Sequence, residues 1–428
     1  MAGVRFKAMG NPRCRQSDRY RRAVCAGAAL LLAIDLIVVS ARRIHQSGDF
    51  DVSMEFGRRF LAGTHLYRGG LHFPYLPAAA MFFSMFSAIP KPLAFLLFYS
   101  IAVAGLWLTL RMLAAMVCGA AADLRDRTWL IATLTLLLAA HYIIRDLDDG
   151  GPNLILLALA TAGMYYAWAG CEVGAGGCLG AAAALKTTAA IFIPFLLWKR
   201  RWRLAAWTTA AAGLWMALPM VRMGVPNWWL HQREWAASAA GFAAGANAAA
   251  ARYYGAGNTS NQALRPAVVY LLARAGLVPT RAAIAGALAA ALLLAAFCLF
   301  TAPPYGPRLE GRWLREASGL LIMSVLLSPV TWIQHLVLAI PALYLIVADY
   351  VACREFGIFS RAALSLYVIF ALVLNRGLLG KARYDNLLGW HVQTWCMILL
   401  LGVLLAHRNG EAATDHSSPC ALRRPVCD

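Results

Sequence analysis

Long stretches without a single charged side chain recur along this chain, and they constrain its fold more than any other feature. The stretch from Ala282 to Phe300 is one of them. A helix that crosses a lipid bilayer needs about 20 predominantly apolar residues, and these stretches approach that length. Composition agrees, because 61% of the 428 residues are hydrophobic, 14% are charged and the mean hydropathy is +0.61. One soluble core could not bury so much apolar surface, so a multi-pass membrane protein is predicted.

Helices are the expected form of these segments, because lipid offers no hydrogen-bond partners to the backbone and the sequence lacks strand-like alternation. We predict an all-α membrane protein with about 10–12 spans of roughly 20 residues each. The stretch Phe73–Ile89 is ambiguous because prolines interrupt its start and end it. The clear candidates are Val24–Val39, Pro92–Leu110, Trp129–Ile144, Leu154–Ala169, Ala175–Trp198, Leu204–Met220, Ala282–Phe300, Ala317–Val330, His335–Val351, Ala362–Leu374 and Trp390–Ala406.

Basic clusters between the apolar stretches indicate on which side each loop lies. The net charge is +19, and the cluster Lys199–Arg203 marks the cytoplasmic side by the positive-inside rule. Such clusters fit membrane topology and anionic lipid headgroups better than nucleic acid, which we do not expect as a partner. The expected layout is a cytoplasmic basic tail (1–22), a membrane domain (23–407) with outward loops at 41–73 and 223–280, and a second cytoplasmic tail (408–428).

The middle of the chain allows two topologies. If Phe73–Ile89 crosses the membrane, the loop Arg145–Asn153 is cytoplasmic and Arg111–Arg127 is outside. If Phe73–Ile89 only dips into the interface, the two loops exchange sides, which agrees better with the positive-inside rule. The second version requires Ala175–Trp198 to be a bent pair of helices with Lys186 near the bend, and we favour this version.

Two carboxylates, Asp49 and Asp51, follow the first predicted span. Residues at i and i+2 do not face one helical site, so only one of them can point into a cavity. A carboxylate beside lipid loses solvation, which raises its pKa and makes it a better general base. From spacing alone, an ordinary polar loop after a span is the favoured alternative.

Four cationic or ionisable side chains are candidates for holding a phosphate. Lys186 lies inside an apolar stretch, where a charge is expensive to bury and marks a functional site by default. Arg265 and His335 lie on the predicted outward side, and Arg145 opens the polar segment that ends at Asn153. The structural alternatives are a lysine paired with a carboxylate, a histidine at a helix end, and a charged turn with an asparagine cap.

Amides and tryptophans on the predicted outward side fit a sugar. Amide groups donate and accept hydrogen bonds together, as sugar hydroxyls require. Tryptophans at this density fit either a sugar-stacking wall or an anchor at the membrane interface. The candidates for sugar or acceptor binding are Asn258, Asn261, Gln262, Trp228, Trp229 and Trp332.

The order of these motifs resembles glycosyltransferase family 87, whose members are membrane enzymes of the GT-C class that use polyprenyl-phosphate sugars. The resemblance covers roughly residues 24–345. Ser53, Gly151, Ala189 and Gln334 stand where the family patterns have Tyr, Gln, Pro and His. The matching segments are Asp49–Val52, Phe60–Gly63, Phe73–Pro77, Gly150–Leu154, Lys186–Ala189, Asn261–Pro266 and Ser328–His335.

The resemblance implies a GT-C-type fold with interfacial helices in the first outward loop and a catalytic aspartate that maps onto Asp49, with Asp51 as the fallback. It implies inverting sugar transfer at the outer face of a bacterial cytoplasmic membrane, from a polyprenyl-phosphate donor to a glycolipid or polysaccharide. Mannose is the favoured sugar, and arabinofuranose is the alternative.

No metal or other cofactor is required by this chemistry, because a phosphate leaves well without one, although Asp148 and Asp149 keep a metal option open. The ten cysteines show no metal-ligand spacing. Two other function classes remain as alternatives: a transporter or flippase for lipid-linked sugars, and a non-catalytic scaffold of envelope assembly. The sequence leaves the oligomeric state open.

Overall fold

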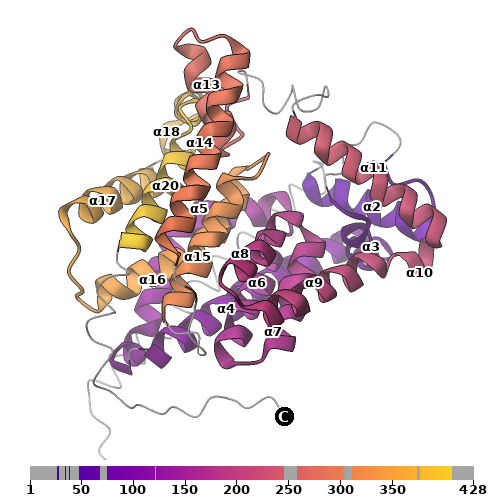
Figure 1. The fold of residues 1–428 in the computed structure, drawn as a ribbon, viewed down its shortest axis with the longest axis horizontal. Coiled ribbons are helices and arrows are strands. Elements are labelled where there is room, and N and C mark those ends of the chain that lie inside the picture. The colour runs from indigo at the N-terminus through magenta and orange to yellow at the C-terminus, as the bar shows by residue number, and fades with distance from the viewer. Residues whose placement is uncertain are drawn as a thin grey trace, which may run out of the picture. The chain divides into compact units, whose positions relative to one another are not determined.

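The computed structural model describes residues 48–67, 75–120, 122–244, 258–302, 304, 311–373 and 376–406, together with Gly27, Ile34 and Val38. Within these residues all regular structure is helical (Figure 1), as predicted. Contacts divide the chain into two units between Gln46 and Ser47, and the description below concerns the second. Both predicted tails and nearly all of the first predicted span lie outside the described residues.

Among the described residues, five helical segments are long and apolar enough to cross a membrane, and a sixth candidate is a pair of helices bent by 57°. The five contain α4 (Lys91–Ala120), α5 (Thr128–Asp149) with the preceding η1 (Ala122–Arg127), α9 (Trp202–Ala217) with α10 (Met220–Met223), α14 (Pro279–Phe300), and η3 (Ile333–Ala339) with α16 (Ile340–Val351). The bent pair consists of α19 (Lys381–Gly389) and α20 (Val392–Ala406).

The other predicted spans correspond to shorter helices. Local breaks explain their length: Gly170, at a φ of +88°, ends α6, and Lys186 in an extended conformation ends α7. These helices are α3 (Pro77–Ser87), α6 (Asn153–Ala169), α7 (Glu172–Leu185), η2 (Thr187–Ile191), α8 (Phe192–Trp198), α15 (Gly311–Leu326) and α17 (Ile358–Val373). The remaining described helices are α2 (Asp49–Ala62), α11 (Val225–Ala244), α13 (Leu264–Arg274) and α18 (Arg376–Leu379).

Small residues let α7 and α9 approach closely. A Cβ atom added at Gly176 would lie 2.5 Å from Cβ of Trp207, and one added at Gly180 would lie 2.5 Å from the backbone nitrogen of Ala212. Two glycines four residues apart on one face are typical of helix packing in lipid, where backbone contact replaces the hydrophobic effect.

The predicted bend at Lys186 is present. Lys186 separates α7 from η2, and its ammonium lies beside Asn153 at the start of α6. The described part of the ambiguous stretch Phe73–Ile89 contains the 11-residue α3, which packs on α2. Eleven residues of helix extend about 16 Å, shorter than a hydrocarbon core of about 30 Å. The side of the membrane on which the loop Arg145–Asn153 lies stays a prediction.

The basic cluster Lys199–Arg203 is largely held in ion pairs. Lys199 Nζ lies 2.8 Å from a carboxylate oxygen of Glu316, and both side chains are fully buried. Arg201 and Arg203 pair with Glu172 at 3.1 and 3.3 Å. The cluster thus joins α7, α8 and α15 instead of offering all its charges to lipid headgroups.

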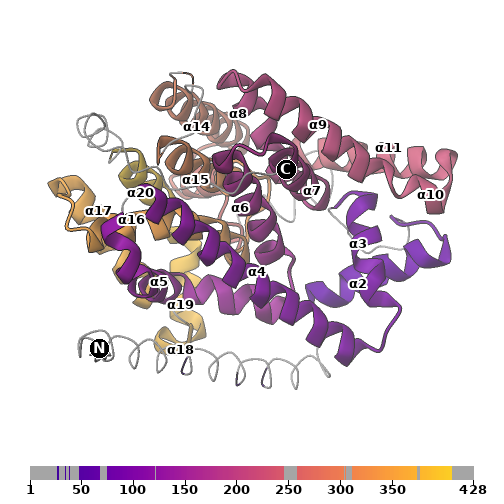
Figure 2. The same ribbon diagram turned by 90° about the horizontal axis from the view of Figure 1, so that it is seen from below.

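Helices also form in both predicted outward loops. α2 follows the first predicted span, and α10 and α11 form the start of the second loop. Figures 1 and 2 show α2, α3, α10 and α11 grouped together, with α11 packed near α3. The candidate site begins at the first residue of α2.

Candidate active site

Asp49 is the first residue of α2 and its side chain is exposed. The positive end of the helix dipole favours an ionised carboxylate at this position. The amide Nε2 of Gln334 lies 3.5 Å from Oδ2 of Asp49, a long contact that links residues 285 positions apart in the chain. Asp49 is therefore accessible and has a polar neighbour from η3.

Asp51 has different partners, as expected for residues at i and i+2. One carboxylate oxygen lies 2.7 Å from Nζ of Lys91 at the start of α4, and the other accepts a hydrogen bond of 3.0 Å from the backbone N–H of Gly48. The second contact satisfies the backbone N–H of the N-cap residue of α2, as the acidic residue of a capping box does. These contacts give Asp51 a structural role in orienting the residue two positions before it.

The start of α2 is fixed against the turn between α5 and α6. Phe50 is buried among aromatic rings, including Phe95 and Phe98 at centroid distances of 5.4 and 5.1 Å. Gly150 ends α5 at a φ of +68°, and a Cβ atom there would lie 2.6 Å from Cβ of Phe50. Glycine is thus required at position 150 both by backbone conformation and by contact.

A buried hydrogen-bond chain orients Lys186. Its Nζ donates to Oδ1 of Asn153 at 2.8 Å, and Nδ2 of Asn153 donates to Oδ1 of Asp146 at 2.6 Å. The second oxygen of Asp146 accepts the backbone N–H of Leu154 at 3.0 Å. A Cβ atom at Gly151 would lie 2.7 Å from Oδ1 of Asp146, so the glycine leaves room for this chain. The motif from Asp146 to Asn153 therefore holds a cation in place.

Asp49 lies within electrostatic range of this hydrogen-bond chain. The charge of Lys186 interacts with Asp146 and with Asp49, and His335 interacts with Lys186. Desolvation, together with the charges of Asp49 and Asp146, raises the pKa of Tyr75 well above that of a free phenol. Tyr75 consequently stays protonated at neutral pH.

Four members of this site were not among the predicted site residues: Asp146, Asn153, Gln334 and Tyr75. The sequence carried a signal for three of them, because Asn153 and Gln334 lie in the segments Gly150–Leu154 and Ser328–His335, and Tyr75 lies in Phe73–Pro77. For Asp146, the only signal in the sequence was the polarity of the segment in which it lies.

The amides predicted to bind sugar are engaged with the backbone. Asn261 donates to the carbonyl of Pro329 at 3.1 Å and accepts the N–H of Thr331 at 2.9 Å. The N–H of Gln262 donates to the carbonyl of Thr331 at 2.6 Å, and its side chain donates to the carbonyl of Leu388 at 3.1 Å. Asn261 and Gln262 thus hold the segment that carries Gln334 and His335.

Other predicted site residues have partners elsewhere. Arg145 is half exposed and pairs with Asp148 and Asp149 on its own helix, at 3.5 and 3.2 Å. Arg265 lies on α13 and packs against Gly286 of α14. Asn258 accepts the N–H of Ser260 in a local turn.

The tryptophans lie on two different elements. Trp228 donates to the carbonyl of Met216 at 2.8 Å and so ties α11 to α9, and its neighbour Trp229 is exposed. Trp332 precedes η3, and its backbone N–H lies 3.3 Å from Nδ1 of His335, which thereby caps η3.

This arrangement offers an exposed carboxylate, a buried ammonium that interacts electrostatically with it, and a histidine that interacts electrostatically with the same ammonium. A carboxylate can accept a proton from a nucleophilic hydroxyl, and a desolvated cation can stabilise charge that develops on a leaving phosphate.

Comparison with known proteins tests whether the chain belongs to the family that its motifs resemble. A comparison with curated protein sequences finds no match. Among solved structures, ArnT from Cupriavidus metallidurans, bound to undecaprenyl phosphate, is similar at 14% identity and a TM-score of 0.38, over 89% of this chain and 77% of that chain. The model of glycosyltransferase family 87 matches residues 73–329, more than half of the chain and the region that supplies Lys186 and its hydrogen-bond chain. This match confirms the resemblance drawn from the motifs, and the chain belongs to glycosyltransferase family 87.

Proposed function

We propose that the protein transfers a sugar from a polyprenyl-phosphate donor to a hydroxyl group of a cell-envelope glycolipid or glycan, with inversion at the anomeric carbon. The observation that carries the proposal is the hydrogen-bond chain from Asp146 through Asn153 to the ammonium of Lys186, whose charge interacts with Asp49. Family membership supports the reaction class.

In the proposed reaction, Asp49 accepts the proton of the acceptor hydroxyl while its oxygen attacks the anomeric carbon. The bond between this carbon and the phosphate oxygen breaks, and the electron pair leaves with the phosphate. Lys186 stabilises the charge that develops there, with His335 as a second candidate. Such stabilisation in a water-poor site is typically worth about 10²–10³ in rate.

Mannose is our favoured donor sugar and arabinofuranose the alternative, both on the strength of the family resemblance. Both sugars would use the same carboxylate and cation. We place the reaction at the outer face of a bacterial cytoplasmic membrane, on the basis of the positive-inside argument for the cluster Lys199–Arg203.

The experiment is a transfer assay with purified protein in lipid, radiolabelled polyprenyl-phosphate mannose and a crude glycolipid extract. We expect wild type to transfer label to an acceptor. We expect the rate of transfer to fall by at least about 100-fold in Asp49→Asn, since the amide cannot accept the proton. Asp51→Asn is the matched variant, because it makes the same chemical change two residues away.

We expect Asp51→Asn to retain turnover within a few-fold of wild type. Equal losses in both variants would place the effect in the fold of α2, and a loss confined to Asp51→Asn would make Asp51 the base. If wild type transfers no mannose, polyprenyl-phosphate arabinofuranose is the next donor. Movement of intact donor across the bilayer without transfer would instead identify a flippase.

A further inference from the structure

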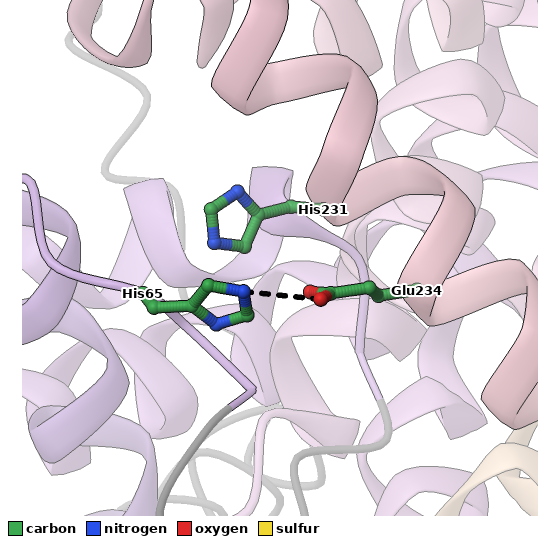
Figure 3. Close-up of side chains that lie close together, drawn as sticks. All are labelled: His65, His231 and Glu234. Atoms are coloured by element: carbon green, nitrogen blue, oxygen red, sulfur yellow. Dashed lines mark hydrogen bonds and ion pairs between the residues drawn. The ribbon is translucent and has the colours of Figure 1, made fainter.

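Three side chains of the metal-ligand type converge at a second place in the fold, outside the hydrogen-bond chain of Lys186. His65 lies in the segment after α2, and His231 and Glu234 lie on α11. Figure 3 shows the two imidazole rings and the carboxylate turned toward one another. The spacing of three residues places His231 and Glu234 on one face of α11. Two imidazoles and one carboxylate are a ligand set typical of zinc.

The distances are short enough for one ion. A ligand atom from each of the three residues lies within 4.8 Å of the other two. Nε2 of His65 is 3.0 Å from a carboxylate oxygen of Glu234, and the centroids of the two imidazole rings are 4.6 Å apart. In a tetrahedral site with bonds of about 2.0–2.1 Å, ligand atoms lie about 3.3 Å apart, so small rotations of these side chains suffice.

The surroundings orient the ligands as a metal site requires. Nδ1 of His231 donates to the backbone carbonyl of Asn227 at 2.6 Å, which leaves Nε2 as the nitrogen with a lone pair. A backbone carbonyl on the outer nitrogen is a common support of metal-binding histidines. Nε2 of His231 accepts the backbone N–H of Leu66 at 3.0 Å, so an ion that binds this nitrogen has to displace that hydrogen bond.

Two polar atoms of the cluster have no hydrogen-bond partner among the described residues. They are Nδ1 of His65 and the second carboxylate oxygen of Glu234, and both atoms are buried. His231 is 3% exposed. A buried carboxylate oxygen without a partner is costly, and a cation supplies what it lacks.

We propose that His65, His231 and Glu234 bind one divalent transition-metal ion of the zinc class. The ion joins the end of the first loop helix, α2, to α11. None of its three ligands belongs to the residues proposed to carry the sugar transfer, so the proposal does not depend on that reaction.

The competing account is a clasp without metal, in which His65 pairs with Glu234 and His231 accepts the bond from Leu66. Glu234→Gln distinguishes the two. Its amide keeps a hydrogen bond to His65, so a metal-free clasp survives, whereas the loss of the anionic ligand weakens metal binding. His141→Gln and His65→Gln form a matched pair, since His141 instead bonds to Tyr384.

The experiment uses the full chain in detergent, stripped with a chelator and titrated with zinc or cobalt. We expect wild type and His141→Gln to bind one equivalent, to unfold at higher temperature with zinc and to give visible bands of tetrahedral cobalt. Glu234→Gln and His65→Gln should bind at least about 10–100-fold more weakly and lose the bands. Identical stoichiometry, bands and thermal shift in all four proteins would overturn the proposal, as would a wild type without bound ion or bands.

Discussion

Asp49 is exposed, whereas the ammonium of Lys186 is almost entirely removed from solvent. This contrast suits the two roles proposed for them, because a base must meet its substrate and a phosphate-binding cation is stronger in a water-poor site. Asp51, two residues from Asp49, is instead engaged in structural contacts, since it pairs with Lys91 and caps α2.

Lys186→Gln is the test of the cation. The glutamine amide can still donate to Asn153, so we expect the protein to fold, but the positive charge is lost. We predict a fall of about 10²–10³ in the turnover of the lipid-linked donor, measured by the transfer assay at saturating acceptor. Full turnover in Lys186→Gln would exclude Lys186 from phosphate stabilisation and leave His335 as the candidate.

At the scale of the elements, close helix contact depends on particular glycines. Gly180 of α7 faces the backbone of α9, whereas a Cβ atom at Gly177 of the same helix would meet nothing within 4 Å. The two glycines therefore differ only in what they contact, which makes them a matched pair.

We predict that Gly180→Ala lowers the thermal unfolding temperature of the protein in lipid, because the added methyl group overpacks the contact at a cost of about 1–3 kcal/mol. Gly177→Ala should be neutral or slightly stabilising, since alanine is the better helix former. Similar unfolding temperatures for both variants would mean that α9 can move away from α7 without cost.

The loop elements follow the same logic. Asn261 and Gln262 connect to the backbone between Pro329 and Thr331, so two segments separated by α13, α14 and α15 form one unit. This gives a physical reason for finding both polar motifs in one sequence. The motif Asn261–Pro266 positions the motif Ser328–His335, which carries Gln334 and His335.

At the scale of the whole molecule, buried ion pairs join distant helices. Glu316 of α15 binds Lys199 at 2.8 Å and Arg312 at 2.8 Å, and Arg315 binds Asp349 of α16 at 2.8 Å. These pairs connect the end of α8, which follows Lys186, to α15, and α15 to α16, so they hold part of the scaffold on which the site is built.

Glu316→Ala should destabilise the protein strongly, by about 3–5 kcal/mol, because it leaves the ammonium of Lys199 buried without a counter-charge. The double variant Lys199→Met with Glu316→Leu should recover most of this loss, since buried ion pairs are often replaceable by apolar residues. Thermal unfolding in lipid measures both. A single variant as stable as wild type would show that water reaches Lys199 at no cost.

The sequence by itself determined the membrane class, the helical form, most helix positions and the family, because hydropathy and motif order are local properties. It also singled out Asp49 and Lys186, because a charged residue beside or within an apolar stretch can be recognised in the linear sequence.

Only the tertiary structure decided which polar segments meet. Asp49 and Gln334 lie 285 positions apart, and Asn153 lies 33 positions from Lys186. His65 lies 169 positions from Glu234. No periodicity or spacing reports such encounters, because they depend on how helices pack, and packing is fixed by contacts such as Gly150 on Phe50 and Gly180 on Ala212.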